Sequence, residues 1–275
     1  PTENAVQKKL GLKTKEDIIK FGIDKFVKTC MTFSKEHATA MNKDFKRFGV
    51  WMDFDDPYMP VTKEFISGQF AFFKKAHDQK RLYKGKKVMH WDSQTETAHA
   101  KHELEYKNVK DMSIYLKFKK KGTENEYFLI WTTTPWTIPF NLAIMANPET
   151  TYVKAKVADE YWILAKDLVG DVSDATGEKL NIVEQFKGKK LEGQEYEHFL
   201  ESEMDGVYAR LKEKQKNVHT ILLSKQHVNT ESGTGLVHCS PGSGPEDEEV
   251  GRAYGIEGYN SLDETGTFTE ASTKE

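Results

Sequence analysis

The sequence predicts an α+β protein: a mainly helical segment followed by a β-barrel or α+β body with short helices. Three observations support this class. Apolar residues recur at helical spacing up to about residue 80, short β-prone runs replace them beyond about residue 82, and turn signals separate those runs. Short strands that follow one another in this way suit a barrel better than a βαβ array.

The helical segment has clear local signals. Residues 14–17, TKED, have the form of a capping box, and apolar residues at helical spacing follow over 18–33. Gly49, which directly follows a basic stretch, predicts the end of this helical part. A second helix is expected over about 62–80, and the aromatic, acidic and proline-broken residues 51–58 predict an ordered loop between the two.

The second part of the chain predicts short strands. Turn signals such as Lys121-Gly122 and Asn147-Pro148 separate the β-prone runs. The expected strands are 87–91, 113–119, 126–134, 152–157, 161–165 and 219–223. A further short strand is expected to carry His238.

Composition limits the function. The chain has 275 residues, and 40 Lys and Arg against 43 Asp and Glu give a net charge of −3, which argues against wholesale coating of nucleic acid duplexes. No apolar run approaches the roughly 20 residues that span a bilayer, so no membrane partner is expected. Two cysteines exclude a disulfide scaffold and fit a reducing, cytoplasmic location. Because the chain starts at Pro1, we expect it to be a piece of a longer protein.

The first segment that stands out for chemistry spans residues 131–141. Three consecutive threonines, Thr132, Thr133 and Thr134, end a predicted strand, and Pro135 stops its hydrogen-bond ladder. Hydroxyls and freed backbone amides at a strand end can hold a water, a ribose or a carbonyl oxygen. Threonine is also simply a good strand former, and composition alone favours that plainer interpretation.

The second segment spans residues 232–249. A flexible turn leads to the strand with His238, and a Gly/Pro loop then enters an acidic helix, with Pro245 in its first turn and Ser243 or Gly244 as its cap. A helix amino terminus keeps a carboxylate such as Asp247 ionised, and an ionised carboxylate in a cleft can receive a substrate ammonium. Spacing alone favours structural roles for both residues, a dipole-complementing acid and a buried histidine.

Rival chemistries for this segment are weaker. Residues 242–244 resemble a phosphate loop only faintly, because G-x-G-x-x-G and a Walker lysine are absent and the acids at 246–249 repel phosphate. Cys239 could be a thiol nucleophile, but it and His238 are neighbours on a strand and point to opposite faces.

Clusters of charged residues and histidines elsewhere in the chain give weaker evidence of a functional site. Basic runs at 84–87, 117–121 and 187–190 are expected to be solvated turns or strand faces. Three histidines lack a carboxylate or thiolate at ligand spacing, and no metal site is expected there: His90, His99 and His102.

Taken together, residues 132–137 and residues 233–238 with 241–247 resemble the two signature segments of an editing domain. That domain is inserted in class I isoleucyl-, valyl- and leucyl-tRNA synthetases. The flanking segments resemble the isoleucyl branch of this family, in its archaeal or eukaryotic-like form: residues 7–11, 45–54, 57–58 and 82–85. The resemblance covers nearly the whole chain.

The resemblance implies a division of the chain and a partner. Residues 1–105 would belong to the catalytic domain and its hinge ribbon, and residues 106–275 to the editing domain, whose family counterpart usually runs further. Its partners would be the 3′ end of tRNA(Ile) with its attached amino acid and the remainder of the synthetase. The HIGH and KMSKS motifs are absent, so ATP and Mg²⁺ are expected only in the full-length enzyme, and editing itself is expected to need no cofactor or metal.

The resemblance also implies residue roles in proofreading hydrolysis of valyl-tRNA(Ile). Asp247 would bind the substrate ammonium. The three threonines, Thr132 to Thr134, would hold the terminal adenosine, the ester and the attacking water, and His238 would set the size limit of the pocket. Further substrate contacts are expected at Trp136, Thr137, Asn141, Gly235 and Gly242.

Two other functions stay open at this point. A valyl- or leucyl-type editing domain is disfavoured by the flanking segments at 7–11 and 45–54. A non-catalytic tRNA-docking module is disfavoured by the intact threonine run and by Asp247, because docking relies on basic and aromatic residues rather than on a carboxylate in a cleft.

Overall fold

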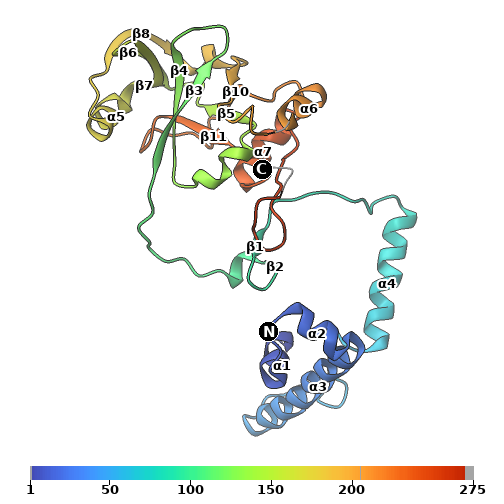
Figure 1. Ribbon diagram of the computed structural model, residues 1–275. Coiled ribbons are helices and arrows are strands. Elements are labelled where there is room, and N and C mark those ends of the chain that lie inside the picture. Colours follow the sequence, from blue (N-terminus) through green and yellow to red (C-terminus); the bar gives the residue numbers. More distant parts are fainter. Residues whose placement is uncertain (1, 205, 270–275) are drawn as a thin grey trace. The chain divides into compact units, whose positions relative to one another are not determined.

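The computed structural model describes residues 2–204 and 206–269, which form two compact units divided between Gly85 and Lys86 (Figure 1). The mixed α+β class is confirmed, because the described part of the first unit has helices and no strand, whereas the second unit contains the sheets. No helix in the described ranges is long and apolar enough to cross a membrane.

The helices of the first unit, within residues 2–85, are α1 (Thr2–Leu10), α2 (Lys15–Phe21), α3 (Ile23–Arg47) and α4 (Lys63–Asp78). The predicted capping box is present at the start of α2, where the Asp17 N–H donates to Thr14 Oγ1 over 3.2 Å and the Thr14 N–H donates to Asp17 Oδ2 over 3.0 Å. Gly22, with φ of +100°, interrupts the apolar helical run and separates α2 from α3. As predicted, α3 ends just before Gly49, and α4 follows its N-cap Thr62.

The second unit contains the strands. They are β1 (His90–Asp92), β2 (Thr97–His99), β3 (Ile114–Lys120), β4 (Glu126–Thr132), β5 (Ala143–Ala146), β6 (Thr151–Val157), β7 (Glu160–Ala165), β8 (Asn181–Lys187), β9 (Tyr196–Glu197), β10 (Thr220–Leu223) and β11 (Leu236–Cys239). The predicted strand at 87–91 starts only at residue 90, and β2, β5, β8 and β9 were not predicted.

Short helices connect these strands. They are the α-helices α5 (Val169–Thr176), α6 (Val207–Lys214) and α7 (Pro245–Ala253), and the 3-10 helices η1 (Lys101–Glu103), η2 (Pro135–Phe140), η3 (Lys166–Leu168) and η4 (Gly188–Leu191). The acidic helix predicted after the Gly/Pro loop is α7, with Gly244 at its N-cap and Pro245 in its first turn.

Two sheets build the body of the second unit. The larger sheet has the order β8-β6-β7-β4-β3-β9, and the smaller one has the order β10-β5-β11. On one side the Tyr196 N–H of β9 donates to the His219 carbonyl beside β10 over 3.0 Å. On the other side β11 packs against β4, and the Ala165 N–H donates to the Thr234 carbonyl over 2.8 Å. The sheets therefore meet along two lines, as in a barrel.

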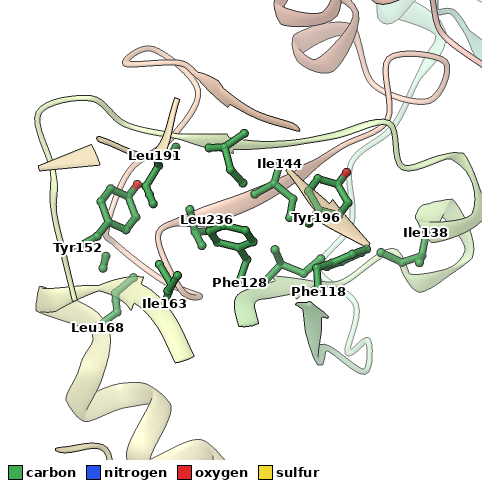
Figure 2. Packing of buried hydrophobic residues seen from close by; sticks show 14 residues of the cluster. Phe118, Phe128, Ile138, Ile144, Tyr152, Ile163, Leu168, Leu191, Tyr196 and Leu236 are labelled. Atoms are coloured by element: carbon green, nitrogen blue, oxygen red, sulfur yellow. The ribbon is translucent and has the colours of Figure 1, made fainter. Parts of the chain in front are cut away.

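The main hydrophobic core lies between these sheets. Phe118 of β3 and Phe128 of β4 are cross-strand partners, and both are fully buried with Ile144, Tyr196 and Leu236 (Figure 2). Full burial of such a side chain stabilises a fold by about 1.5–3 kcal/mol. The packing therefore fixes β4 and β11, the two strands that lead into the candidate motifs.

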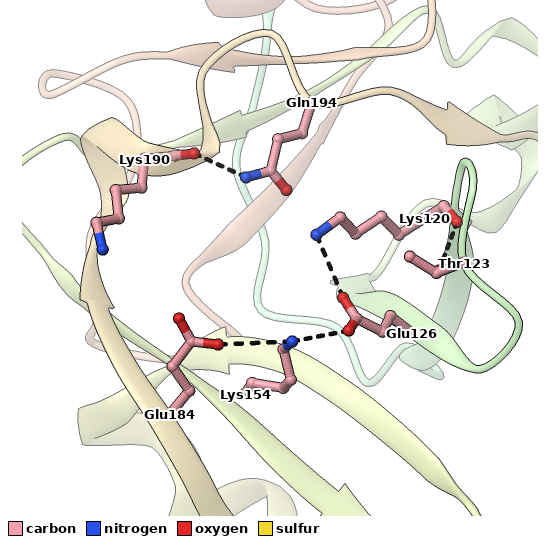
Figure 3. A network of polar contacts seen from close by, with 7 residues as sticks. All are labelled: Lys120, Thr123, Glu126, Lys154, Glu184, Lys190 and Gln194. Atoms are coloured by element: carbon pink, nitrogen blue, oxygen red, sulfur yellow. Dashed lines mark hydrogen bonds and ion pairs between the residues drawn. The ribbon is translucent and has the colours of Figure 1, made fainter.

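One group of paired charges lies on the larger sheet. Glu126 accepts from Lys120 over 3.2 Å and from Lys154 over 2.7 Å, and Lys154 also lies 3.5 Å from Glu184 (Figure 3). Burial raises the pKa of Glu126, but the two lysine hydrogen bonds outweigh it and leave that pKa lowered. The other lysines of this run are also paired: Lys117 with Glu160, Lys119 with Glu197 and Lys121 with Glu195. The lysines of run 117–121, on β3 and on the turn that follows it, are therefore paired with carboxylates.

Candidate functional site

The two motifs meet where β4 and β11 end. β11 pairs antiparallel with β5, with His238 opposite Ile144, and it also packs against β4. His238 Nε2 consequently lies 2.9 Å from the hydroxyl oxygen of Thr137, which belongs to η2 just beyond the threonine run. The structure therefore joins the threonine segment to the histidine strand by a direct hydrogen bond.

The threonine run forms a turn rather than a strand end. β4 stops at Thr132 and not at the predicted residue 134, because the Thr134 N–H donates to Thr132 Oγ1 over 3.0 Å instead of to a neighbouring strand. The Thr132 and Thr134 hydroxyl oxygens are 3.2 Å apart, and the Thr137 hydroxyl donates to the Thr134 carbonyl over 2.8 Å. Thr133 is exposed. The run thus gathers hydroxyls at one turn, with one side chain open to solvent.

The protonation of His238 is fixed by Asn141. The Asn141 Nδ2 donates to the Ala143 carbonyl over 2.8 Å, which orients the amide. The same Nδ2 lies 3.3 Å from His238 Nδ1, so Nδ1 accepts and Nε2 carries the proton that is donated to Thr137. Burial lowers the pKa of His238 to about 4. The ring is therefore neutral at pH 7 and acts as a hydrogen-bond donor toward the threonine turn.

Asn141 is a supporting residue in this structure. It is fully buried, and its Oδ1 accepts a hydrogen bond from the Tyr196 hydroxyl over 2.5 Å. The side chain thus bonds to His238, to the Ala143 carbonyl and to Tyr196 at the same time. Its predicted direct contact with substrate stays a prediction, whereas its support of His238 is visible.

Asp247 is fastened to the end of β11. It lies in the first turn of α7, and its Oδ2 accepts from the Ser240 N–H over 3.0 Å, two residues beyond His238. Burial raises the pKa of Asp247 to about 6, in spite of the Ser240 hydrogen bond. The carboxyl is therefore mostly ionised at pH 7 and becomes protonated below about pH 6.

The predicted glycines are explained by close packing. A Cβ at Gly235, whose φ is +72°, would lie 2.4 Å from the Ala165 Cβ, and a Cβ at Gly242 would lie 2.6 Å from the Tyr259 carbonyl oxygen. Trp136 is different, because 55% of it is exposed, and it is available to a ligand. The structure thus gives the glycines a packing role, and their substrate contacts stay predictions.

The thiol alternative has no support in the geometry. Cys239 is fully buried, and burial raises the pKa of its thiol well above the usual value. Its Sγ lies 3.8 Å from the Asp247 carbonyl oxygen, on the strand face opposite to His238. A protonated, buried thiol is a poor nucleophile.

Two of the three histidines of the loose cluster lie on the β1–β2 ribbon, and His102 lies in η1. His90 and His99 are cross-strand partners on the ribbon. Within residues 2–204 and 206–269, no group of three or more His, Cys, Asp or Glu side chains could hold a metal ion.

Three functional candidates were not predicted. Tyr196, His198 and Tyr208 are buried and bond to the segment that carries Thr137 and Asn141. They come from β9, from the loop after it and from α6, so no motif in the sequence marks them.

The profile of the family "tRNA synthetases class I (I, L, M and V)" matches residues 1–213. The chain belongs to this class I tRNA synthetase family.

Within the family, the whole chain is similar to archaeal isoleucine–tRNA ligases. It is 48% identical to that of Pyrococcus horikoshii and 47% identical to that of Pyrococcus abyssi, in each case over 284 aligned residues. Each match covers 100% of this chain and 26% of the relative, so the chain spans about a quarter of the length of these relatives. The predicted resemblance to the archaeal isoleucyl branch is thereby confirmed.

One of the solved structures that match is an editing domain. The crystal structure of the P. knowlesi cytosolic leucyl-tRNA synthetase editing domain aligns with a TM-score of 0.41 and 12% sequence identity, covering 59% of this chain and 77% of that one.

Proposed function

We propose that residues 106–275 are the editing domain of an isoleucyl-tRNA synthetase and hydrolyse the ester between valine and the 3′ end of tRNA(Ile). Residues 1–105 then belong to the catalytic domain and its hinge ribbon. The observation that carries the proposal is the hydrogen bond between Thr137 and His238, which brings the two signature segments into one site. Similarity to isoleucine–tRNA ligases over the whole chain supports it.

The threonine turn supplies the groups that ester hydrolysis needs. An aminoacyl ester is already reactive, so the site has to place a water and stabilise the oxyanion; one well-placed donor contributes about 2.7–4 kcal/mol in such reactions. Each threonine hydroxyl both donates and accepts. In the proposal the three threonines, Thr132 to Thr134, together hold the terminal adenosine, the ester and the attacking water. Trp136 and Thr137 make further contacts with the substrate.

Asp247 holds the amino group of the substrate. In the described ranges the Ser240 N–H is the only hydrogen-bond donor to its carboxylate, through Oδ2, which leaves Oδ1 for an ammonium. Partial burial strengthens such a contact, because the local dielectric constant is lower than that of water.

His238 limits the size of the side chain that is accepted. Its ring is held on both nitrogens, by Thr137 and by Asn141, and so it cannot swing away from a larger substrate. A separate editing site is useful because one methylene gives only about 1–3 kcal/mol of discrimination in an apolar pocket. This magnitude is the general one for synthetases that must distinguish isoleucine from valine.

The proposed reaction uses no metal and no covalent intermediate. ATP and Mg²⁺ belong to amino acid activation by the full-length enzyme, for which this chain carries neither HIGH nor KMSKS. Two free cysteines, Cys30 and Cys239, fit a cytoplasmic location.

A deacylation assay on three esters of one tRNA(Ile) tests the proposal. The intact protein is expected to hydrolyse valyl-tRNA(Ile) and to spare isoleucyl-tRNA(Ile). Preference for threonyl-tRNA would instead indicate a valyl-type editing site, and binding without hydrolysis of any ester would indicate a docking module. Persistence of activity after iodoacetamide treatment is expected, since no thiolate takes part.

A further inference from the structure

The turn that carries the site is anchored from the protein interior. η2 contains Pro135 and Pro139, which have no N–H. The Ile138 carbonyl accepts from the Asn141 N–H over 2.9 Å, and further donors to the turn come from outside it. The Tyr208 hydroxyl of α6 donates to the Pro139 carbonyl over 2.9 Å, and His198 Nε2 lies 3.1 Å from the Ile138 carbonyl. Two buried side chains from distant segments thus hold two consecutive carbonyls of the turn.

His198 is locked in the form that can donate to the turn. The Leu200 N–H donates to His198 Nδ1 over 3.1 Å, so Nδ1 accepts and the proton is on Nε2, which faces the Ile138 carbonyl. The ring also packs on Tyr208, with centroids 4.7 Å apart. Burial lowers the pKa of His198 to about 3, so it stays neutral at pH 7.

Tyr196 extends the same support to the catalytic histidine. Its hydroxyl donates to Asn141 Oδ1, Asn141 donates to His238 Nδ1, and His238 donates to Thr137. All three bonds run in one direction and leave one possible tautomer at His238. Tyr196 is fully buried, and its hydroxyl bonds to Asn141.

We propose that Tyr196, His198 and Tyr208 are positioning residues of the editing site. Together they hold η2 and Asn141 so that Thr137 and His238 keep the geometry that the reaction needs. None of the three is proposed to touch the substrate, and the inference rests on the proposed hydrolysis. Misplacement of reacting groups by a fraction of an ångström lowers the turnover rate much more than it lowers substrate binding.

Two phenol-to-phenyl variants of the intact protein test this directly. Tyr208→Phe and Tyr196→Phe remove one hydroxyl each and keep the ring. We expect each to lower kcat for valyl-tRNA(Ile) deacylation about 10-fold, with KM changed by less than about twofold. The matched control is Tyr254→Phe. The Tyr254 hydroxyl accepts from the Leu223 N–H of β10 rather than bonding to η2, and this variant is expected to keep full kcat.

His198 allows a second, independent comparison. His198→Gln can keep a donor at the place of Nε2, whereas His198→Asn keeps only an acceptor at the place of Nδ1. The glutamine variant is therefore expected to retain several-fold more activity than the asparagine variant, at equal thermal stability. Equal activity of both, or a tyrosine variant that behaves like Tyr254→Phe, would overturn the inference.

A double-mutant cycle separates positioning from general destabilisation. If Tyr208 acts through the turn, Tyr208→Phe should add less than about twofold to the loss caused by Thr137→Val. Independent, multiplicative losses would contradict the inference. The underlying function is judged separately: an unmodified protein that leaves valyl-tRNA(Ile) intact refutes the hydrolysis itself, whereas an active protein with insensitive variants refutes only the positioning roles.

Discussion

His238 donates a hydrogen bond to the Thr137 hydroxyl over 2.9 Å, although the two residues are 101 positions apart in the chain. The bond has a defined direction, because the opposite ring nitrogen accepts from Asn141. A neutral imidazole that donates toward a group of hydroxyls orders their lone pairs and protons. The proposed hydrolysis requires such an order, which a chance cluster of threonines would lack.

Replacing the proposed ammonium receptor should remove activity. Asp247→Ala is expected to lower kcat/KM for valyl-tRNA(Ile) at least about 100-fold, because a hydrogen bond to a charged group contributes up to about 3 kcal/mol. Glu246→Ala is the matched control, since Glu246 is exposed in the same helical turn. The initial rate of deacylation checks the prediction, and equal rates for the two variants would refute the role of Asp247.

The same carboxyl should cost stability at neutral pH. The pKa of this carboxyl is raised from 3.8 to about 6 in the folded protein, so the folded state binds the proton more tightly than the unfolded state does. The stability that this proton contributes is lost as the pH rises through 6. Asp247→Asn is therefore expected to raise the free energy of unfolding by about 2–3 kcal/mol at pH 7.5 and by almost nothing at pH 3.5. Urea unfolding at both pH values measures this difference; a destabilised variant at pH 7.5 would contradict it.

Removal of the histidine ring should relax substrate selection. His238→Ala leaves space next to Thr137, and isoleucyl-tRNA(Ile) is then expected to be hydrolysed as well as valyl-tRNA(Ile). The ratio of the two rates is the measurement, and it should fall toward one. His238→Gln, which can keep a donor toward Thr137 and part of the bulk, is the control that retains the hydrogen bond. If selectivity survives in His238→Ala, the ring does not set the size limit.

Local signals predicted the elements that flank the site. The capping box at Thr14 and Asp17 and the proline at residue 245 act within a few residues of themselves, and the structure has helices starting at both places. Strand β5 was missed because all four of its residues, 143–146, are buried and show no alternation. Strand β8 was missed because its residues are mostly exposed, so no apolar face distinguishes it.

The candidate site was only partly predictable. His238 and Asp247 stand out as chemistry-bearing residues on a recognisable strand-loop-helix pattern, whereas the tautomer of His238 depends on Asn141, 97 positions away. Tyr196 donates to the side-chain amide of Asn141, 55 positions away. Tyr208 donates to the carbonyl of Pro139, 69 positions away. Such contacts arise only once the two sheets have closed on their core, and no local pattern encodes them.

Three buried histidines should make the second unit sensitive to acid. Burial lowers the pKa of His198 to about 3, of His219 to about 2 and of His238 to about 4. The unfolded chain takes up these protons below about pH 6.5, and the folded chain does not. The free energy of unfolding is therefore unaffected by protonation of these histidines above about pH 6.5. It falls as the pH drops toward 4, by up to about 1.4 kcal/mol per pH unit for each histidine. The raised pKa of Asp247 acts in the opposite sense and offsets one of them.

His219 is the place to test this sensitivity. It is 1% exposed, neither ring nitrogen has a hydrogen-bond partner in the described residues, and its φ of +60° is one that asparagine also tolerates. His219→Asn should reduce the slope of the unfolding free energy between pH 6.5 and 4.5 by about 1 kcal/mol per pH unit. His102→Asn, at an exposed position, should leave the slope unchanged. The prediction concerns a slope, so it holds even if the substitution changes the free energy of unfolding by the same amount at every pH. Equal slopes for both variants would show that His219 takes up its proton in the folded protein too.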